Sequence, residues 1–194
     1  HDRVVWAYAE GAMRLGVDVF QSTAVTGVRM EKGRVTGVET SSGFIAAGTV
    51  LSAVGGHVTT IASMVGLRLP IRTHPLQAFV TNRYAQAFHP IVASSGLSGY
   101  ASQTAKGEML IGAEIDGAPS YAYDSGHAFL QHCAFRMMTL LPFLRDLRVL
   151  RQWTGVCDMT PDYSPIMSPT PVAGFYLTTG WGTWGFKAIP AGGE

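Results

Sequence analysis

The residues best suited to cofactor chemistry form a glycine-rich stretch near the end of this 194-residue sequence. It reads Gly180-Trp181-Gly182-Thr183-Trp184-Gly185-Phe186-Lys187, so its glycines have G-x-G-x-x-G spacing after a predicted strand. Glycine lets backbone N–H groups approach a phosphate or a flavin ring, and a helix N-terminus attracts negative charge. The Rossmann fingerprint is incomplete, because only nine residues follow Gly185, without a second strand or an acidic residue about 20 positions on. A purely structural glycine-rich turn therefore stays an open alternative.

Two further features suit cofactor or substrate binding. Lys187 is one of three lysines in the chain, and a cation at a helix entrance suits a substrate carboxylate or a negatively charged flavin ring. An ordinary surface lysine is the alternative. The stretch 52–57 (SAVGGH) is a strand-end turn of small residues. Small side chains let a nucleotide approach the backbone, although many such turns serve packing alone.

Other catalytic motifs are missing from the sequence. Its six histidines form neither HExxH nor HxH, so we expect no metal site and regard each as a surface or packed histidine. There is no GxSxG elbow of a serine hydrolase and no GxxxxGK[ST] phosphate loop. Cys133 and Cys157 form no CxxC pair, which suits a reducing compartment.

The composition excludes several classes of protein. Charged residues make up 14% of the chain, against about 25% in typical domains. The formal net charge of +1 gives no case for a nucleic-acid partner or an anionic membrane surface. No apolar run approaches the roughly 18 to 20 residues of a spanning helix, and the glycines are scattered rather than repeated. Low charge and abundant glycine then leave the interpretation that the chain is part of a larger protein, in which other parts cover its apolar surface.

Hydrophobic periodicity and turn residues predict a mixed α and β chain. The expected helices are 2–15, 57–65 and 126–141, and the expected strands are 17–20, 23–30, 34–40, 44–46, 49–54, 74–82, 100–103, 108–113, 149–158 and 175–179. The third helix places Leu130, Cys133, Ala134, Met137 and Leu141 on one face. An antiparallel middle between two α/β-like flanks indicates a substrate domain inserted into a nucleotide-binding domain.

Seven segments in consistent order resemble the D-amino-acid oxidase-like family of FAD-dependent oxidoreductases, and within it the β subunits of heterotetrameric sarcosine oxidases. They are 1–6 (HDRVVW), 25–28 (VTGV), 68–71 (RLPI), 74–78 (HPLQA), 106–108 (KGE), 161–166 (PDYSPI) and 180–187. The resemblance implies an incomplete α+β or α/β oxidoreductase fold of this family. Residues 1–71 would belong to the FAD-binding domain, 72–158 to an antiparallel-sheet substrate domain, and 159–194 to the FAD-binding domain again.

The resemblance also implies site residues, position by position. His1 matches the histidine that carries covalent FMN, and Val25 matches a hairpin strand beside the adenine of non-covalent FAD. Lys187 matches the lysine that binds the substrate carboxylate near the flavin. The turn beside the ribose and pyrophosphate is matched by Ala53, Val54 and Gly55, and the isoalloxazine contacts are matched by Gly180, Gly182, Thr183, Gly185, Phe186 and Lys187.

The implied reaction is oxidative demethylation of sarcosine, or a similar N-methyl amino acid, to glycine. A hydride would pass to FAD and electrons to FMN, and oxygen would be reduced to hydrogen peroxide. Tetrahydrofolate, bound by a partner subunit of the heterotetramer, would take the one-carbon unit in the cytoplasm. A dimethylglycine or proline dehydrogenase-like subunit is the alternative within this fold, and a non-catalytic fragment or subunit is the alternative outside enzymes.

Two departures from the family pattern bear on these expectations. Trp184 stands where the family commonly has a small residue, so its ring would alter packing against the flavin or subunit contacts. The dinucleotide-binding βαβ unit and the substrate-binding arginine expected upstream are missing, and the helix continuing from Ala188 is short. We therefore expect a fragment of a subunit about twice as long, with poor flavin binding and no oxidase activity in isolation.

Overall fold

The computed structural model describes residues 2–113 and 115–194, which form two compact units. The first unit runs to Val50 and also takes in Pro169–Phe175, and the second holds Leu51–Ser168 and Tyr176–Glu194. Helices combine with antiparallel sheets, which confirms the mixed α and β class. The boundaries of these two compact units differ from the expected domain boundaries at residues 71 and 158. The assignment of a FAD-binding domain and a substrate domain therefore stays a prediction.

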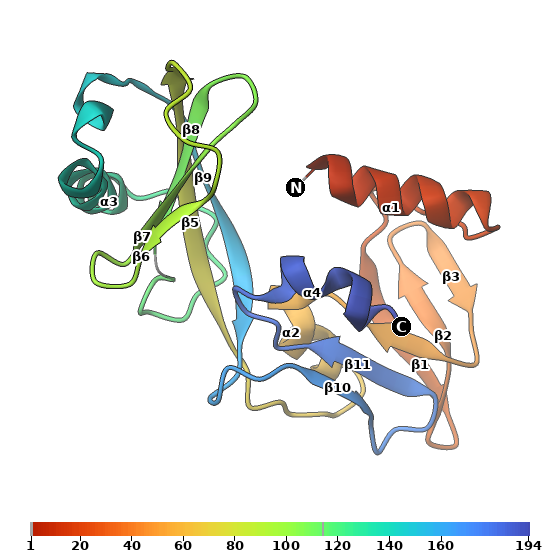
Figure 1. The fold of residues 1–194 in the computed structure, drawn as a ribbon. Helices are drawn as coiled ribbons and strands as arrows, with labels where there is room; N and C mark the ends of the chain where they lie inside the picture. Colours follow the sequence, from red (N-terminus) through yellow and green to blue (C-terminus); the bar gives the residue numbers. More distant parts are fainter. Residues whose placement is uncertain (1, 114) are drawn as a thin grey trace. The chain divides into compact units, whose positions relative to one another are not determined.

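The first unit contains a helix and a three-stranded meander (Figure 1). Helix α1 (Asp2–Arg14) ends where Gly16 adopts a left-handed φ of 88°, and none of its residues is buried. Strands β1 (Val25–Glu31), β2 (Arg34–Thr40) and β3 (Gly43–Ala46) pair antiparallel in that order, close to the predicted ranges.

The short strand expected at 17–20 is wrong. These residues adopt no strand conformation, and Val17, Val19 and Phe20 expose 51%, 41% and 63% of their surface. An apolar run becomes a strand when a neighbouring strand satisfies its backbone groups, and no described strand pairs with this one.

Gly37 in β2 leaves no room for a side chain. A Cβ there would overlap the carbonyl oxygen of Ile45 and the ring of Phe44, and the Arg29 guanidinium lies 3.8 Å from the centroid of that ring. We expect Gly37→Ala to lower the free energy of unfolding by about 2 kcal/mol in urea titrations, because the packed neighbours must move. Gly27→Ala in the adjacent strand is the control, since its Cβ would meet Glu39 at an ordinary 3.5 Å. Equal stability of the two variants would contradict this packing.

The second unit is built on a five-stranded antiparallel sheet of order β6-β7-β8-β5-β9. Its strands are β5 (Arg72–Arg83), β6 (Val92–Ser94), β7 (Gly99–Gln103), β8 (Glu108–Ala113) and β9 (Val149–Met159). Helix α3 (His127–Leu140) covers one face, as Figure 1 shows. Cys133 and Met137 from the predicted apolar face of α3 join Phe79, Met109 and Ile111 in a buried core.

Shorter elements complete the chain. They are β4 (Val50–Ser52), the 3-10 turn η1 (Gly55–His57), α2 (Val58–Ser63), the 3-10 turn η2 (Pro142–Asp146), β10 (Ile166–Pro169), β11 (Phe175–Thr179) and α4 (Gly185–Gly192). Strands β10, β11 and β4 form a sheet in that order. None of the helices in the described residues is long and apolar enough to cross a membrane.

Candidate functional site

The glycine-rich stretch forms a tight turn between β11 and α4 that a buried carboxylate holds in place. Asp158, at the end of β9, is 4% exposed. Its Oδ2 accepts hydrogen bonds from Thr179 Oγ1 at 2.7 Å and from the Gly180 backbone N–H at 2.5 Å. Hydrogen bonds to a charged acceptor are stronger than neutral ones, so this carboxylate fixes where the turn begins.

The first two glycines of the motif are also required by packing inside the protein. Gly180 and Gly182 have left-handed φ values of 71° and 51°, which strain any side chain. A Cβ at Gly180 would lie 2.7 Å from Thr160 Cγ2, and one at Gly182 would lie 2.9 Å from Met159 Sδ. Gly180 donates its N–H to Asp158, whereas the backbone N–H groups of Trp181, Gly182 and Thr183 have no hydrogen-bond acceptor among the described residues.

Lys187 lies in the first turn of α4, as the sequence predicts, and contacts an aromatic ring. Its Nζ is 4.1 Å from the ring centroid of Trp184, the residue at the helix start. The face of an indole attracts a cation. Trp184 is 56% exposed, so the ammonium rests on a solvent-accessible indole.

The second predicted turn, Ala53–Gly55, has open space at its tip. Gly55 adopts a left-handed φ of 51°, and nothing lies within 4 Å of where its Cβ would be. Just before the turn, Ser52 Oγ is buried without a hydrogen-bond partner among the described residues. A buried hydroxyl without a partner costs stability, so an outside polar group would satisfy it. The turn thus has the open backbone and the unmet polar atom that suit a bound nucleotide.

Both turns meet strand β9, within the second unit. Gly56 packs on it, since a Cβ at Gly56 would lie 2.7 Å from Val156 Cγ2, whereas Gly182 packs on Met159 three residues further along β9. The structure therefore places the turn at Ala53–Gly55 and the glycine-rich turn against the same half of strand β9. Val25 lies in the first unit, and His1 lies outside the described residues.

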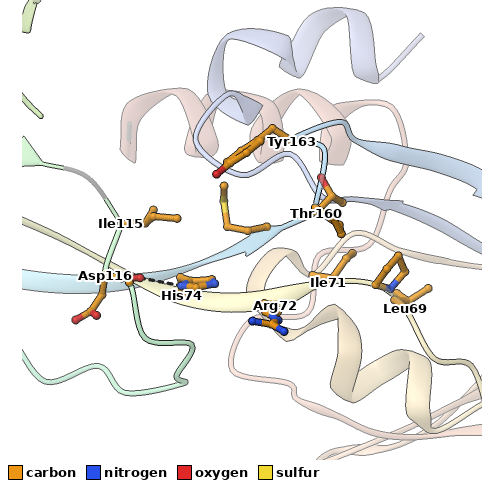
Figure 2. Close-up of a pocket in the computed structure, with 12 residues that line it drawn as sticks. Leu69, Ile71, Arg72, His74, Ile115, Asp116, Thr160 and Tyr163 are labelled. Atoms are coloured by element: carbon orange, nitrogen blue, oxygen red, sulfur yellow. Dashed lines mark hydrogen bonds between the residues drawn. The ribbon is translucent and has the colours of Figure 1, made fainter. Parts of the chain in front are cut away.

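A pocket of about 710 Å³ lies beside the glycine-rich turn, with Met159 in its wall. Its polar lining includes Arg72 and His74 from β5 and Tyr163 from the turn after β9, on the other side of the pocket (Figure 2). His74 Nδ1 lies 2.8 Å from the carbonyl oxygen of Asp116. This volume and this mixture of apolar and polar groups suit a small-molecule site.

Sequence reasoning missed these pocket residues as a functional site. The alternation of Arg72 and His74 on a strand otherwise rich in apolar residues is a usable signal, since residues two apart share a face. Tyr163 has a left-handed φ of 59°, which is rare for an aromatic residue and invisible in the sequence.

The two cysteines are both free thiols and do not suit nucleophilic chemistry. Burial raises the pKa of Cys133 to about 11 and that of Cys157 to about 11, the second with help from the Asp158 carboxylate. At neutral pH both are therefore protonated. Among the described residues no group of three or more His, Cys, Asp or Glu side chains is arranged to hold a metal ion.

These features, a glycine-rich turn that opens a helix, an open turn at a strand end and a pocket on an antiparallel sheet, are those of a flavin-dependent oxidoreductase. The model of the family "FAD dependent oxidoreductase" matches residues 1–194, and the chain belongs to this family. It is 43% identical over 193 residues to "Sarcosine oxidase subunit beta" of Rhodobacter capsulatus, covering 100% of this chain and 47% of that protein. The corresponding protein of Rhizobium meliloti is 45% identical over 193 residues, with 100% and 46% covered.

Solved structures show the same fold. L-proline dehydrogenase from P. horikoshii superimposes with a TM-score of 0.91 at 28% identity, over 98% of this chain and 52% of that one. Glycine oxidase from Geobacillus kaustophilus superimposes with a TM-score of 0.84 at 20% identity, over 94% and 49%. The chain thus spans about half the length of the relatives it matches.

The described residues fit FAD. The free N–H groups of Gly182 and Thr183 precede the N-terminus of α4, where a negatively charged or carbonyl oxygen is favoured. The open tip at Gly55 and the unpartnered Ser52 hydroxyl suit the ribose or phosphate portion. The family is FAD dependent, and the geometry of both turns suits such a cofactor.

Proposed function

We propose that the complete protein oxidises sarcosine, or a closely similar N-methyl amino acid, as part of a sarcosine oxidase-like assembly. FAD, when bound, would accept the hydride from the N-methyl carbon. The observation that carries this proposal is the unbroken match of this chain to sarcosine oxidase β subunits at 43% and 45% identity. The position of Lys187, in the first turn of α4 beside the turn suited to FAD, supports it.

The chain's own residues would divide the work between two turns and a pocket. Ala53, Val54 and Gly55 would contact the ribose and pyrophosphate, with Val25 beside the adenine. Gly182 and Thr183 would hold the flavin ring through their N–H groups, with Gly180, Gly185 and Phe186 shaping the turn. The Lys187 ammonium would bind the substrate carboxylate, which places the methyl group toward the flavin.

A substrate panel tests this proposal in the complete protein, purified with its partner subunits and loaded with FAD. Sarcosine, dimethylglycine, L-proline and glycine are compared by oxygen consumption, by hydrogen peroxide formation and with an artificial electron acceptor. We expect the highest kcat/KM for sarcosine, with peroxide formed. A preference for L-proline together with reduction of the artificial acceptor alone would replace the proposal by a proline dehydrogenase function, which the structural match at a TM-score of 0.91 favours as the second candidate.

The second cofactor and the partners form a separate part of the proposal. We propose that His1 carries covalent FMN, that the electrons leave through it to oxygen, and that a partner subunit presents tetrahydrofolate to the one-carbon product. Mass spectrometry of the peptide that contains His1 is expected to show the added mass of FMN. An unmodified peptide from flavin-saturated protein would refute the covalent link and leave the FAD proposal intact.

A further inference from the structure

The fold sets which nitrogen of His74 carries hydrogen. Nδ1 lies 2.8 Å from the carbonyl oxygen of Asp116, and a carbonyl oxygen accepts but never donates. Nδ1 must therefore be the N–H donor, and in the neutral imidazole Nε2 keeps its lone pair. Among the described residues nothing hydrogen-bonds to Nε2.

This imidazole faces the pocket beside the glycine-rich turn. His74 is half-buried, and it lies with Arg72 on the same face of β5, because side chains two apart on a strand point the same way. In the antiparallel register Arg72 is opposite Met159, and His74 is opposite Cys157. Since Met159 packs under Gly182, His74 lies two residues along β5 from the position beside the turn. Figure 2 shows the imidazole on one side of the pocket and Tyr163 on the other.

Amine oxidation requires a group that accepts a proton from the substrate nitrogen. An amino acid binds at neutral pH with its nitrogen protonated, and a protonated nitrogen has no lone pair to support loss of hydride from the neighbouring carbon. We propose that His74 Nε2 accepts the proton from the substrate ammonium group. The N–H bond of the ammonium breaks, its electron pair stays on the substrate nitrogen, and the proton forms the Nε2–H bond of an imidazolium. This inference rests on the proposed function.

The groups that face His74 come from strands β5 and β9 and from the loops that follow β8 and β9. Arg72 on the same strand as His74 adds a positive charge to the lining of the pocket. Asp116 faces His74 with its backbone carbonyl oxygen, whereas its side-chain Oδ1 accepts a hydrogen bond from the Ala118 backbone N–H. The thiol of Cys157 on β9 is neutral, since burial raises its pKa to about 11, and Tyr163 lines the other side of the pocket. The ring orientation is already fixed by the Asp116 carbonyl, so proton transfer needs no rotation of the side chain.

The test separates the two nitrogens of the ring in the complete, FAD-loaded protein. His74→Asn keeps an N–H donor near the position of Nδ1 and removes the Nε2 lone pair. His74→Gln serves as a second variant, and His89→Asn, at an exposed loop position, is the matched control. We expect the kcat/KM for sarcosine to fall at least 30-fold in both His74 variants at pH 7 and to remain at the wild-type value in His89→Asn.

The pH profile is the readout that a merely structural role would not move. In the wild-type protein we expect kcat/KM to fall as the pH is lowered, because a protonated His74 has no lone pair on Nε2 to accept the proton of the substrate. In the His74 variants it climbs steadily toward high pH and approaches the wild-type value where the free substrate amine is already neutral. Nitrogen NMR of 15N-histidine-labelled protein at high pH is expected to show His74 with hydrogen on Nδ1 and none on Nε2.

Each outcome decides the matter. Wild-type oxidation of sarcosine with an unchanged pH profile in the His74 variants would overturn the role of His74 and leave the proposed function standing. A wild-type protein that oxidises no N-methyl amino acid would instead reject the proposed function itself. Hydrogen on Nε2 in the neutral ring would overturn the inference even if neither His74 variant folds.

Discussion

Replacing Asp158 by alanine is expected to lower the free energy of unfolding of the complete protein by about 3 kcal/mol or more. The buried carboxylate accepts two hydrogen bonds, and its removal leaves Thr179 Oγ1 and the Gly180 N–H buried without partners. Urea unfolding measures the loss. Amide hydrogen exchange at Gly180 should accelerate in the native state, because the turn loses its anchor.

Asp162 provides the matched control for this prediction. It lies four residues further along, in an exposed turn, where its Oδ1 accepts a hydrogen bond from the Ser164 backbone N–H at 3.1 Å. Asp162→Ala removes a carboxylate from water rather than from the interior, so we expect a loss of less than about 1 kcal/mol. The loss of stability in Asp158→Asn should lie between those of the two alanine variants, since the amide oxygen can still accept a hydrogen bond. Equal losses in Asp158→Ala and Asp162→Ala would show that Asp158 does not anchor the turn.

Lys187→Met is expected to lower kcat/KM for sarcosine by about 100-fold, the effect of one charge-assisted hydrogen bond to a carboxylate. Methionine keeps the length of the side chain and its packing on Trp184 while it removes the charge. FAD content, measured by visible absorbance, should stay near the wild-type value. A lost cofactor would mean that Lys187 holds the flavin rather than the substrate.

Lys106→Met is the control, because Lys106 lies in the exposed turn between β7 and β8. Its kcat/KM should equal that of the wild-type protein. Lys187→Arg should keep part of the activity, since arginine also carries a charge but places it differently. Unchanged kcat/KM in Lys187→Met would reject the role of Lys187 in carboxylate binding.

The parts of the fold with strong local signals were predictable from the sequence. Strand β11 occupies the predicted residues 175–179, and the predicted strands 100–103 and 108–113 form β7 and β8, joined by a turn in which Gly107 has a φ of 95°. Apolar periodicity also predicted α3 to within one residue at each end. Each of these signals depends on neighbours in the chain: a capping glycine, an alternating pattern or a helical face.

The missed elements depend on distant partners instead. Strand β10 contains Pro169 in a proline-rich stretch that indicates a loop, and it forms a strand because β11 lies beside it. The three residues of β6 are too few to show alternation. Residues 17–20 have a pattern that suits a strand, but they form none, because no described strand pairs with them. Whether such a segment forms a strand depends on pairing with a strand that is distant in the sequence. A local residue pattern carries no information about that partner.

The site was predictable in part. The sequence identified both turns and Lys187 as candidates, and the structure brings the turns to one half of β9. It did not identify Asp158, which looks like the last residue of an apolar strand until its two hydrogen bonds are seen. The first two motif glycines have a packing reason as well as a cofactor reason, and G-x-G-x-x-G spacing alone does not distinguish the two.

Exposed apolar side chains on and just after α1 affect how this chain behaves in water by itself. Trp6, Tyr8 and Leu15 expose 51%, 52% and 87% of their surface. Exposed apolar surface of this extent favours self-association, and the attraction rises on warming from low temperature. Dilute, cold solutions of the isolated chain should therefore stay clear, while concentrated or warmed ones become turbid.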